Sequence, residues 1–209
     1  MIRIGIIGNI GSGKSYVAQN FGYPVFNADY EVAQLYQRDK KIYRKLKKSL
    51  PKYIQSFPIK KKEISNAILA NKNNLKKIVK IVHTEIRKKL NDFLKKHKNR
   101  KFLILDIPLL LENKINKKKD ILVFVQSNQS DILKRLKKRK NFNQKLLKKF
   151  KATQYSTSYK KKKSDFIIKN NFKKNSVING IKNIQKKIKT MGAEAAPPTF
   201  AWLPTAKKK

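Results

Sequence analysis

Short apolar runs alternate along this chain with longer stretches that mix apolar and polar residues. The apolar runs cover residues 2–7, 24–26, 102–107, 121–125 and 166–168, and each has the length of a strand. Strands separated by helical stretches are typical of parallel sheets, because a parallel connection needs a long crossover. The pattern therefore predicts an α/β protein of three layers, in which helices cover both faces of a parallel sheet.

Three longer stretches have helical spacing and cover about 72–98, 129–140 and 175–190. In the first, apolar residues return every three or four positions while lysine fills the other faces. Residues 38–70 hold short helical patterns around Pro51 and Pro58 and predict an insertion between the second and third strands. An insertion at this point suits a subdomain that covers a substrate.

The segment between the first strand and the next helical stretch reads Gly-Asn-Ile-Gly-Ser-Gly-Lys-Ser over residues 8–15, a complete G-x-x-x-x-G-K-[ST] pattern. Its glycines let backbone N–H groups converge on phosphate oxygens, and the helix start that follows favours an anion. We expect Lys14 to bridge the β- and γ-phosphates and Ser15 to bind Mg²⁺. The alternative is a glycine-rich strand-to-helix turn with an incidental lysine, and the order of strand, loop and helix favours the phosphate site.

The pattern therefore predicts an ATP site within a three-layer P-loop nucleoside-triphosphate hydrolase or kinase fold. The expected nucleotide contacts follow the loop into the helix: Gly8, Asn9, Ile10, Gly11, Ser12, Gly13, Lys14, Ser15 and Tyr16.

Composition changes this interpretation only a little. The 53 lysines and arginines give a formal charge of +41, which invites a nucleic-acid partner. Only seven of them are arginine, the residue suited to bidentate recognition, and the lysines spread over nearly every helix. Lys, Asn and Ile are enriched together, as AT-rich codon usage produces, so we favour a compositional origin and expect no specific nucleic-acid partner.

The chain has no cysteine, which excludes disulfides and thiol catalysis and fits a reducing compartment. We see neither a membrane span nor a signal peptide and expect a cytoplasmic protein. The domain is expected over 1–190, with an insertion at about 38–98 and a lid at about 135–160. Residues 191–209, rich in Ala and Pro, are expected to be a disordered or non-native tail. The sequence predicts no oligomeric state.

Two carboxylates follow predicted strands. Asp29 comes just after the second strand, where it could accept a hydroxyl proton or hold Mg²⁺ through water, or simply cap the helix that follows. Asp106 ends the third strand in a Walker-B-like pattern, although an apolar strand that ends in Asp is common. Both would lie at the carboxyl edge of the sheet, beside the phosphate loop.

Basic pairs at helical spacing are the other candidates. Arg135 and Arg139 lie four apart, hence on one helix face, and could reach a nucleotide together, or Asp131 could pair with Arg135 on a solvated face. His83 and Arg87 are likewise four apart, and locally a surface pair is the simplest interpretation.

Together these segments resemble the dephospho-CoA kinase family from residue 2 to about 188. The resemblance includes the loop at 10–15, Asn-Ala-Asp at 27–29, His-Thr-Glu-Ile-Arg at 83–87 and Asp-Ile-Pro-Leu-Leu-Leu-Glu at 106–112. It continues with the lid arginines, Gln154 followed by Asp165, and the closing segment at 164–170. Asn27 stands where the family usually has the first Asp, and Thr84 where it has Pro, so metal or hydroxyl contacts from position 27 are in doubt.

The resemblance implies ATP-dependent phosphorylation of the ribose 3′-hydroxyl of dephospho-coenzyme A. It makes Asp29 the catalytic candidate, with Lys14 and Arg135, and places Arg139 on the nucleotide. Acceptor contacts are implied for Asp29, His83, Arg87, Asp106, Pro108 and Leu109. Two alternatives remain at this stage: a kinase for another nucleoside or small metabolite, and a nucleic-acid-binding P-loop ATPase.

Overall fold

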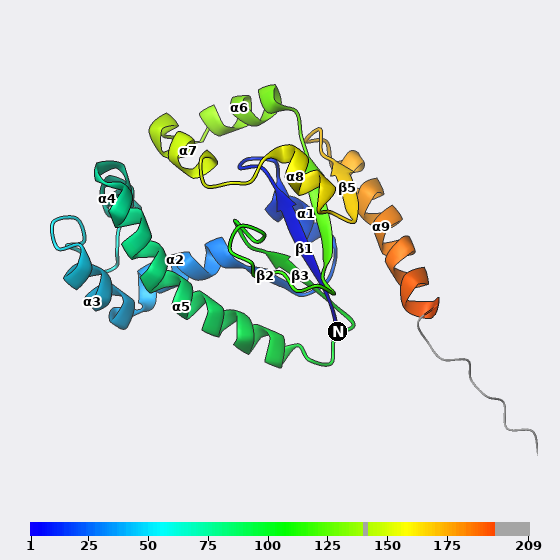
Figure 1. The fold of residues 1–209 in the computed structure, drawn as a ribbon, viewed down its shortest axis with the longest axis horizontal. Coiled ribbons are helices and arrows are strands. Elements are labelled where there is room, and N and C mark those ends of the chain that lie inside the picture. The colour runs from blue at the N-terminus through cyan, green and yellow to red at the C-terminus, as the bar shows by residue number, and fades with distance from the viewer. Residues whose placement is uncertain (140–141, 195–209) are drawn as a thin grey trace, which may run out of the picture.

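The computed structural model describes residues 1–139 and 142–194, and within them five strands form one parallel sheet (Figure 1). The strands are β1 (Ile2–Gly8), β2 (Val25–Asn27), β3 (Phe102–Asp106), β4 (Ile121–Gln126) and β5 (Phe166–Lys169). Their order is β2-β3-β1-β4-β5, and every neighbouring pair is parallel. Each strand falls on one of the apolar runs, so the predicted parallel sheet is confirmed.

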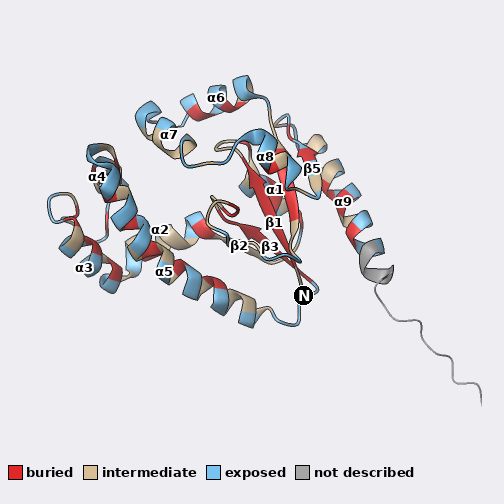
Figure 2. Cartoon of the chain, in the orientation of Figure 1, coloured by how far each residue is buried: buried red, intermediate tan, exposed pale blue. Residues whose placement is uncertain are grey.

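Helices cover both faces of the sheet and complete the three layers that the sequence predicts. On one face, α1 (Lys14–Asn20) and α9 (Lys174–Glu194) bury residues such as Phe21 and Ile181 against β1 and β4. On the other face, α2 (Ala28–Arg38) and α5 (Lys72–Lys96) share a second apolar cluster with Phe26 and Leu105. Figure 2 shows the strands β1, β3 and β4 almost wholly buried, while the helices expose their outer sides. Burial of these apolar side chains is the main force that holds the layers together.

The segment between β2 and β3 forms a helical arm to one side of the sheet (Figure 1). It contains α2, α3 (Lys40–Ser49), α4 (Lys61–Ala70) and α5, and its apolar residues join the cluster of the second face. The helix predicted at about 72–98 is α5, which ends at Lys96. Lysine occupies the outer faces of these helices, where its charge stays in water.

The segment between β4 and β5 contains α6 (Gln129–Lys137), α7 (Gln144–Lys151) and α8 (Thr157–Lys162). It reaches the helical arm through Lys149 on α7, whose Nζ donates to the carbonyl oxygens of Ile68 at 2.7 Å and Leu69 at 2.9 Å. Those carbonyls belong to the last turn of α4, where a cation is favoured. The candidate lid and the arm therefore touch each other over the carboxyl edge of the sheet.

The predicted boundary between domain and tail falls inside a helix, because α9 continues to Glu194. Residues 195–209 of the predicted tail lie outside the described residues. Across the part of the chain that the structure describes, every helix is too short or too polar to cross a membrane.

Candidate functional site

The loop between β1 and α1 has the backbone that its glycines predict. Gly11 has φ 84° and Gly13, the N-cap of α1, has φ 90°, a left-handed conformation that side chains disfavour. A Cβ at Gly11 would also come within 3.0 Å of Ile132 on α6. The left-handed glycines and the packing of α6 against Gly11 thus both hold the loop in its curled form.

Ser12 lies at the centre of this loop and is 1% exposed. Its carbonyl oxygen accepts from Ser127 Oγ at 2.9 Å and from Asn170 Nδ2 at 2.8 Å. Its own hydroxyl has no hydrogen-bond partner among the described residues. Because an unpartnered buried hydroxyl is costly, this atom fits a loop that closes around a polar ligand such as a triphosphate.

Lys14 begins α1 and turns back over the loop. Its Nζ donates to the carbonyl oxygens of Gly8 at 3.2 Å and Asn9 at 3.0 Å. Burial lowers the pKa of this ammonium, although the negative charges of Asp106, Asp29 and Glu112 oppose the shift. A phosphate oxygen would offer this partly desolvated cation a stronger partner than two carbonyls.

Asp106 stands at the carboxyl end of β3, directly beside Asn27 at the end of β2. It is 4% exposed, and its Oδ2 accepts from Asn27 Nδ2 at 2.7 Å. Burial raises the pKa of Asp106, the Ser15 hydroxyl and Lys14 oppose this, and the negative charge of Asp29 adds to it. The register of the parallel strands thus brings Lys14, Ser15 and Asp106 together, as the sequence predicts.

Asp29 lies in the first turn of α2 and does not cap it. The N-cap is Asn27, whose Oδ1 accepts from Tyr30 N at 2.8 Å, so the capping alternative for Asp29 is wrong. Asn27 uses both ends of its amide, one to start α2 and one to hold Asp106. Asn27, which stands where Asp is expected, therefore has a structural role in these two hydrogen bonds. Asp29 does not cap the helix and is available for a role in the reaction.

Three cations from three different segments act on Asp29. Asp29 is exposed to solvent, yet desolvation by the protein around it raises the pKa of its carboxyl group, and Lys14, Lys61 and Arg139 each lower it. Lys61 begins α4 in the helical arm, and Arg139 follows α6. Asp29 therefore faces the loop, the arm and the candidate lid at once.

The two arginines of the candidate lid differ from the sequence-based expectation. Helix α6 ends at Lys137, so Arg139 lies beyond it, and the expectation of one shared helix face is wrong. Arg135 stacks on the ring of Phe172, with 4.4 Å from Cζ to the ring centroid. Among the ion pairs of the described residues, none joins Arg135 to Asp131, which removes that alternative.

The remaining candidates lie on α5 and after β3. His83 is half-buried and Arg87 exposed on α5, and burial together with the charge of Arg87 lowers the pKa of His83. Thr84 fits the helix, since its Oγ1 donates to the carbonyl oxygen of Lys80 at 3.2 Å. Pro108 is half-buried, and Leu109, with φ 57°, lines a cavity beside Gly8 and Lys14.

The same cavity is lined by further residues that are not among the site residues predicted from the sequence. Its lining includes Glu112, Gln154 and Lys160, of which only the first two belong to a motif. Lys160 is one lysine in a run of four, so nothing in the sequence distinguishes it from its solvated neighbours. Only the position of α8 against β1 brings its side chain to the loop.

Comparisons with known proteins agree with this geometry. The family model for dephospho-CoA kinase matches residues 2–175. A dephospho-CoA kinase of Wolbachia pipientis wMel is 38% identical over 87% of this chain and 95% of its own length, and one of Rickettsia bellii is 34% identical over 80% and 87%.

Two solved structures share the fold. The crystal structure of TT1252 from Thermus thermophilus superposes with a TM-score of 0.72 at 24% identity, covering 94% of this chain and 98% of that one. Dephospho-CoA kinase from Campylobacter jejuni gives a TM-score of 0.57 at 21% identity, covering 89% and 96%. The family model and the relatives, taken with the phosphate loop and its neighbouring carboxylates, show that this chain belongs to the dephospho-CoA kinase family.

Proposed function

We propose that this protein transfers the γ-phosphoryl group of ATP to the ribose 3′-hydroxyl of dephospho-coenzyme A, which gives coenzyme A and ADP in the final step of coenzyme A biosynthesis. The observation that carries the proposal is the convergence of Lys14, Asp106 and Asp29 at the carboxyl edge of the sheet in a chain of this family. A P-loop beside two carboxylates supports phosphoryl transfer to an alcohol.

On the nucleotide side, the residues from Gly8 to Tyr16 hold the triphosphate. Backbone N–H groups of the loop donate to its oxygens, and Lys14 exchanges the carbonyls of Gly8 and Asn9 for phosphate oxygens. Arg135 and Arg139 close over the nucleotide from the candidate lid. The stacking of Arg135 on Phe172 supports this role, because the same flat guanidinium can stack on a base.

Mg²⁺ fits the donors present. Ser15 supplies a hydroxyl oxygen, and Asp106 supplies a buried carboxylate that a cation would neutralise. No cluster of three or more His, Cys, Asp or Glu side chains suited to a metal occurs in the described residues, as expected for an ion held largely by water and phosphate. When bound, Mg²⁺ would neutralise charge on the β- and γ-phosphates.

On the acceptor side, Asp29 accepts the proton of the 3′-hydroxyl group. The oxygen of that hydroxyl group attacks the γ-phosphorus, and the bond between the γ-phosphorus and the bridging oxygen of the β-phosphate breaks. The raised pKa of Asp29 supports this role, since a more basic carboxylate takes a proton more readily. His83 and Arg87 line the path of the acceptor on α5, together with Asp106, Pro108 and Leu109. The arm that contains α5 covers the acceptor, and we place the reaction in the cytoplasm.

One experiment tests the substrate. ADP release is measured with a panel of dephospho-CoA, nucleosides, nucleoside monophosphates and RNA at fixed ATP. We expect efficient turnover with dephospho-CoA alone and mass spectrometry of its product to show one added phosphoryl group at the ribose. Preferential turnover of another small acceptor would assign a different kinase, and release stimulated by RNA without a phosphorylated product would assign an ATPase.

A further inference from the structure

Lys160 on α8 has an unusual environment for a lysine of this protein. It is 2% exposed, and no other lysine of the described residues is buried. Its neighbour Lys162, on the same helix, is exposed like most of the others. Burial of an ammonium group is costly unless charged or strongly accepting partners compensate, so its position requires an explanation.

The partners of Lys160 in this structure are weak ones. Its Nζ donates to Asn9 Oδ1 at 3.3 Å and forms an ion pair with Glu112 Oε1 at 3.8 Å, which is beyond hydrogen-bonding distance. The same Glu112 oxygen accepts from Tyr155 N at the shorter distance of 2.8 Å. An ammonium has three N–H donors, and these two long contacts leave its hydrogen-bonding capacity largely unused.

Both partners connect Lys160 to the phosphate loop. Asn9 is a loop residue, and its Nδ2 also donates to Thr157 Oγ1 at 3.0 Å on α8. Lys160 lines the same cavity as Gly8 and Lys14, and its positive charge is close enough to lower the pKa of Lys14. The two ammonium groups repel each other, and an anion bound beside both of them would relieve this repulsion.

The position of the cavity indicates which phosphate is involved. Half of its lining residues, Ile107 and Leu109 to Glu112, follow β3, so it lies on the side of β1 where β3 and Asp106 are. Arg135 on α6 and Phe172 follow β4 and β5, the strands on the other side of β1 in the sheet, and Phe172 lies near Gly13 at the start of α1. The phosphate next to the acceptor is the one transferred.

We propose that Lys160 is a second phosphate-binding cation of this active site, whose ammonium leaves Asn9 and Glu112 to contact the γ-phosphoryl group of bound ATP. Together with Lys14 it balances the negative charge on that group during transfer, while Glu112 keeps Lys160 in place in the free enzyme. The proposal rests on the function proposed above in taking ATP as the nucleotide and in placing the acceptor beside Asp106.

Direct binding of ATP and ADP to Lys160→Met tests this role, because only ATP carries the γ-phosphoryl group. We expect its affinity for ATP to fall roughly tenfold and its affinity for ADP to stay within about twofold of the unmutated enzyme. Turnover at saturating ATP is expected to fall about a hundredfold. Lys162→Met, which removes an exposed lysine from the same helix, is expected to change none of these quantities.

Equal losses for ATP and ADP, or no loss for either, would overturn the proposal and leave Lys160 a structural residue. If Lys160→Met does not fold, as judged by thermal unfolding, Lys160→Gln replaces it, because the amide can still donate to Asn9 while the charge is gone. The same ATP-selective loss is expected and the same equal loss overturns the proposal. The binding measurement needs no acceptor, so an error in the proposed acceptor would show only in the substrate panel.

Discussion

Partial desolvation shifts the pKa values of the basic and acidic side chains around the phosphate loop in opposite directions. It lowers the pKa of Lys14 and raises those of Asp29 and Asp106, because burial disfavours the charged form of each. The attraction between Lys14 and the two carboxylates opposes all three shifts, whereas the negative charge of Asp29 adds to the shift of Asp106. A bound nucleotide would change this balance by adding negative charge beside Lys14, so the free site is prepared for an anion.

Lys14→Ala is predicted to abolish turnover without harming the fold. The lost ammonium contacts two loop carbonyls and no apolar core, so thermal unfolding is expected near the temperature of the unmutated protein. Turnover is expected to fall by about two orders of magnitude or more, equivalent to roughly 3 kcal/mol of transition-state stabilisation. Steady-state ADP release checks this, and turnover close to that of the unmutated enzyme would refute the phosphate-loop assignment.

Asp29→Asn is predicted to reduce turnover far more than ATP affinity, since it keeps the shape of the side chain but removes the basic oxygen. A base with a raised pKa is active above that pKa, so turnover of the unmutated enzyme should decline as the pH falls through it. That decline should begin above the ordinary value of 3.8 and should be weaker in the residual activity of the variant, in which Asp106 still titrates.

The matched control for this measurement is Asp131→Asn, which removes an acidic side chain from the first turn of α6 in the same way. We expect it to keep the acidic decline in turnover. Loss of ATP binding in Asp29→Asn with normal turnover per bound ATP would instead make Asp29 a metal or structural residue.

Among single residues, the sequence could predict the roles of those that belong to a recognisable motif. Lys14, Ser15 and Asp106 come together because strand register brings motif residues to one edge of the sheet. Asn27 could be predicted only as a departure, because its hydrogen bond to Asp106 depends on the ends of β2 and β3 lying side by side. Lys160 could not be predicted, since burial and not residue type separates it from the other lysines.

Elements were predictable where the apolar pattern is long and regular. The five strands and α5 match the sequence pattern within a few residues, because apolar spacing and burial determine both. The apolar pattern could not predict that α6 ends at Lys137, because the lysine-rich sequence that follows is also compatible with a helix. The position of Arg139 therefore differed from expectation.

The turn that leads into α4 depends on one carboxylate. Glu63 accepts from Gln55 N and Ser56 N through Oε1, and from Ser56 Oγ and Lys60 N through Oε2, each at 3.0 Å. Desolvation tends to raise the pKa of Glu63, but these hydrogen bonds outweigh it and the pKa is lowered. Glu63 therefore joins the loop after α3 to the start of α4, which shapes the arm that we place over the acceptor.

Glu63→Gln is predicted to destabilise the fold by about 2 kcal/mol near neutral pH, because an amide nitrogen cannot accept two of these bonds. A lowered folded pKa means that the stabilisation is fully present above the ordinary value of 4.5 and is lost as the pH falls through the lower folded value. Urea unfolding at about pH 7 and about pH 3 should therefore show a difference between the two proteins that shrinks in acid.

Glu85→Gln is the control, since among the described residues Glu85 pairs only with the exposed Lys45 and Lys88. Its expected cost is below about 1 kcal/mol, as for other surface ion pairs. An effect of Glu63→Gln no larger than that of the control would show that the arm does not depend on this carboxylate.

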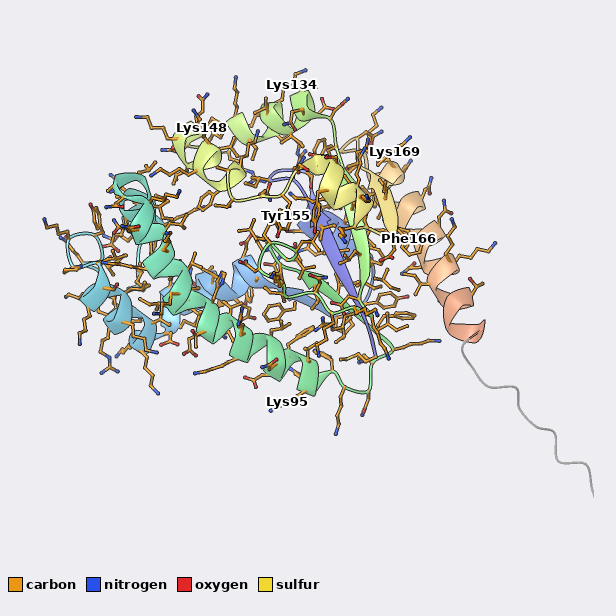
Figure 3. All side chains as sticks on the ribbon, viewed as in Figure 1. Lys95, Lys134, Lys148, Tyr155, Phe166 and Lys169 are labelled. Carbon is orange, nitrogen blue, oxygen red and sulfur yellow. The ribbon has the colours of Figure 1, made fainter. Side chains whose placement is uncertain are left out.

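At the scale of the whole molecule, the excess of positive charge is spread over many helices. Lys95, Lys134 and Lys148, labelled in Figure 3, are exposed on α5, α6 and α7. With 12 acidic residues against 53 basic ones, most of these charges have no acidic side chain to pair with. The layers themselves are held by apolar burial, so the sequence could combine an ordinary α/β core with an extreme surface charge.

Weak, sequence-independent adhesion to polyanions is the predicted consequence of this surface. Cations spread over many elements attract phosphates by charge alone, and release of counterions makes such binding fall steeply with salt. Titration of duplex and single-stranded nucleic acid should therefore give measurable affinity at low salt, little near physiological salt, and no preference for sequence. ATP turnover with dephospho-CoA should be the same with and without the nucleic acid at physiological salt. Tight, salt-tolerant binding that stimulates ATP hydrolysis would instead support a nucleic-acid-dependent ATPase, because only a site built for that partner resists screening.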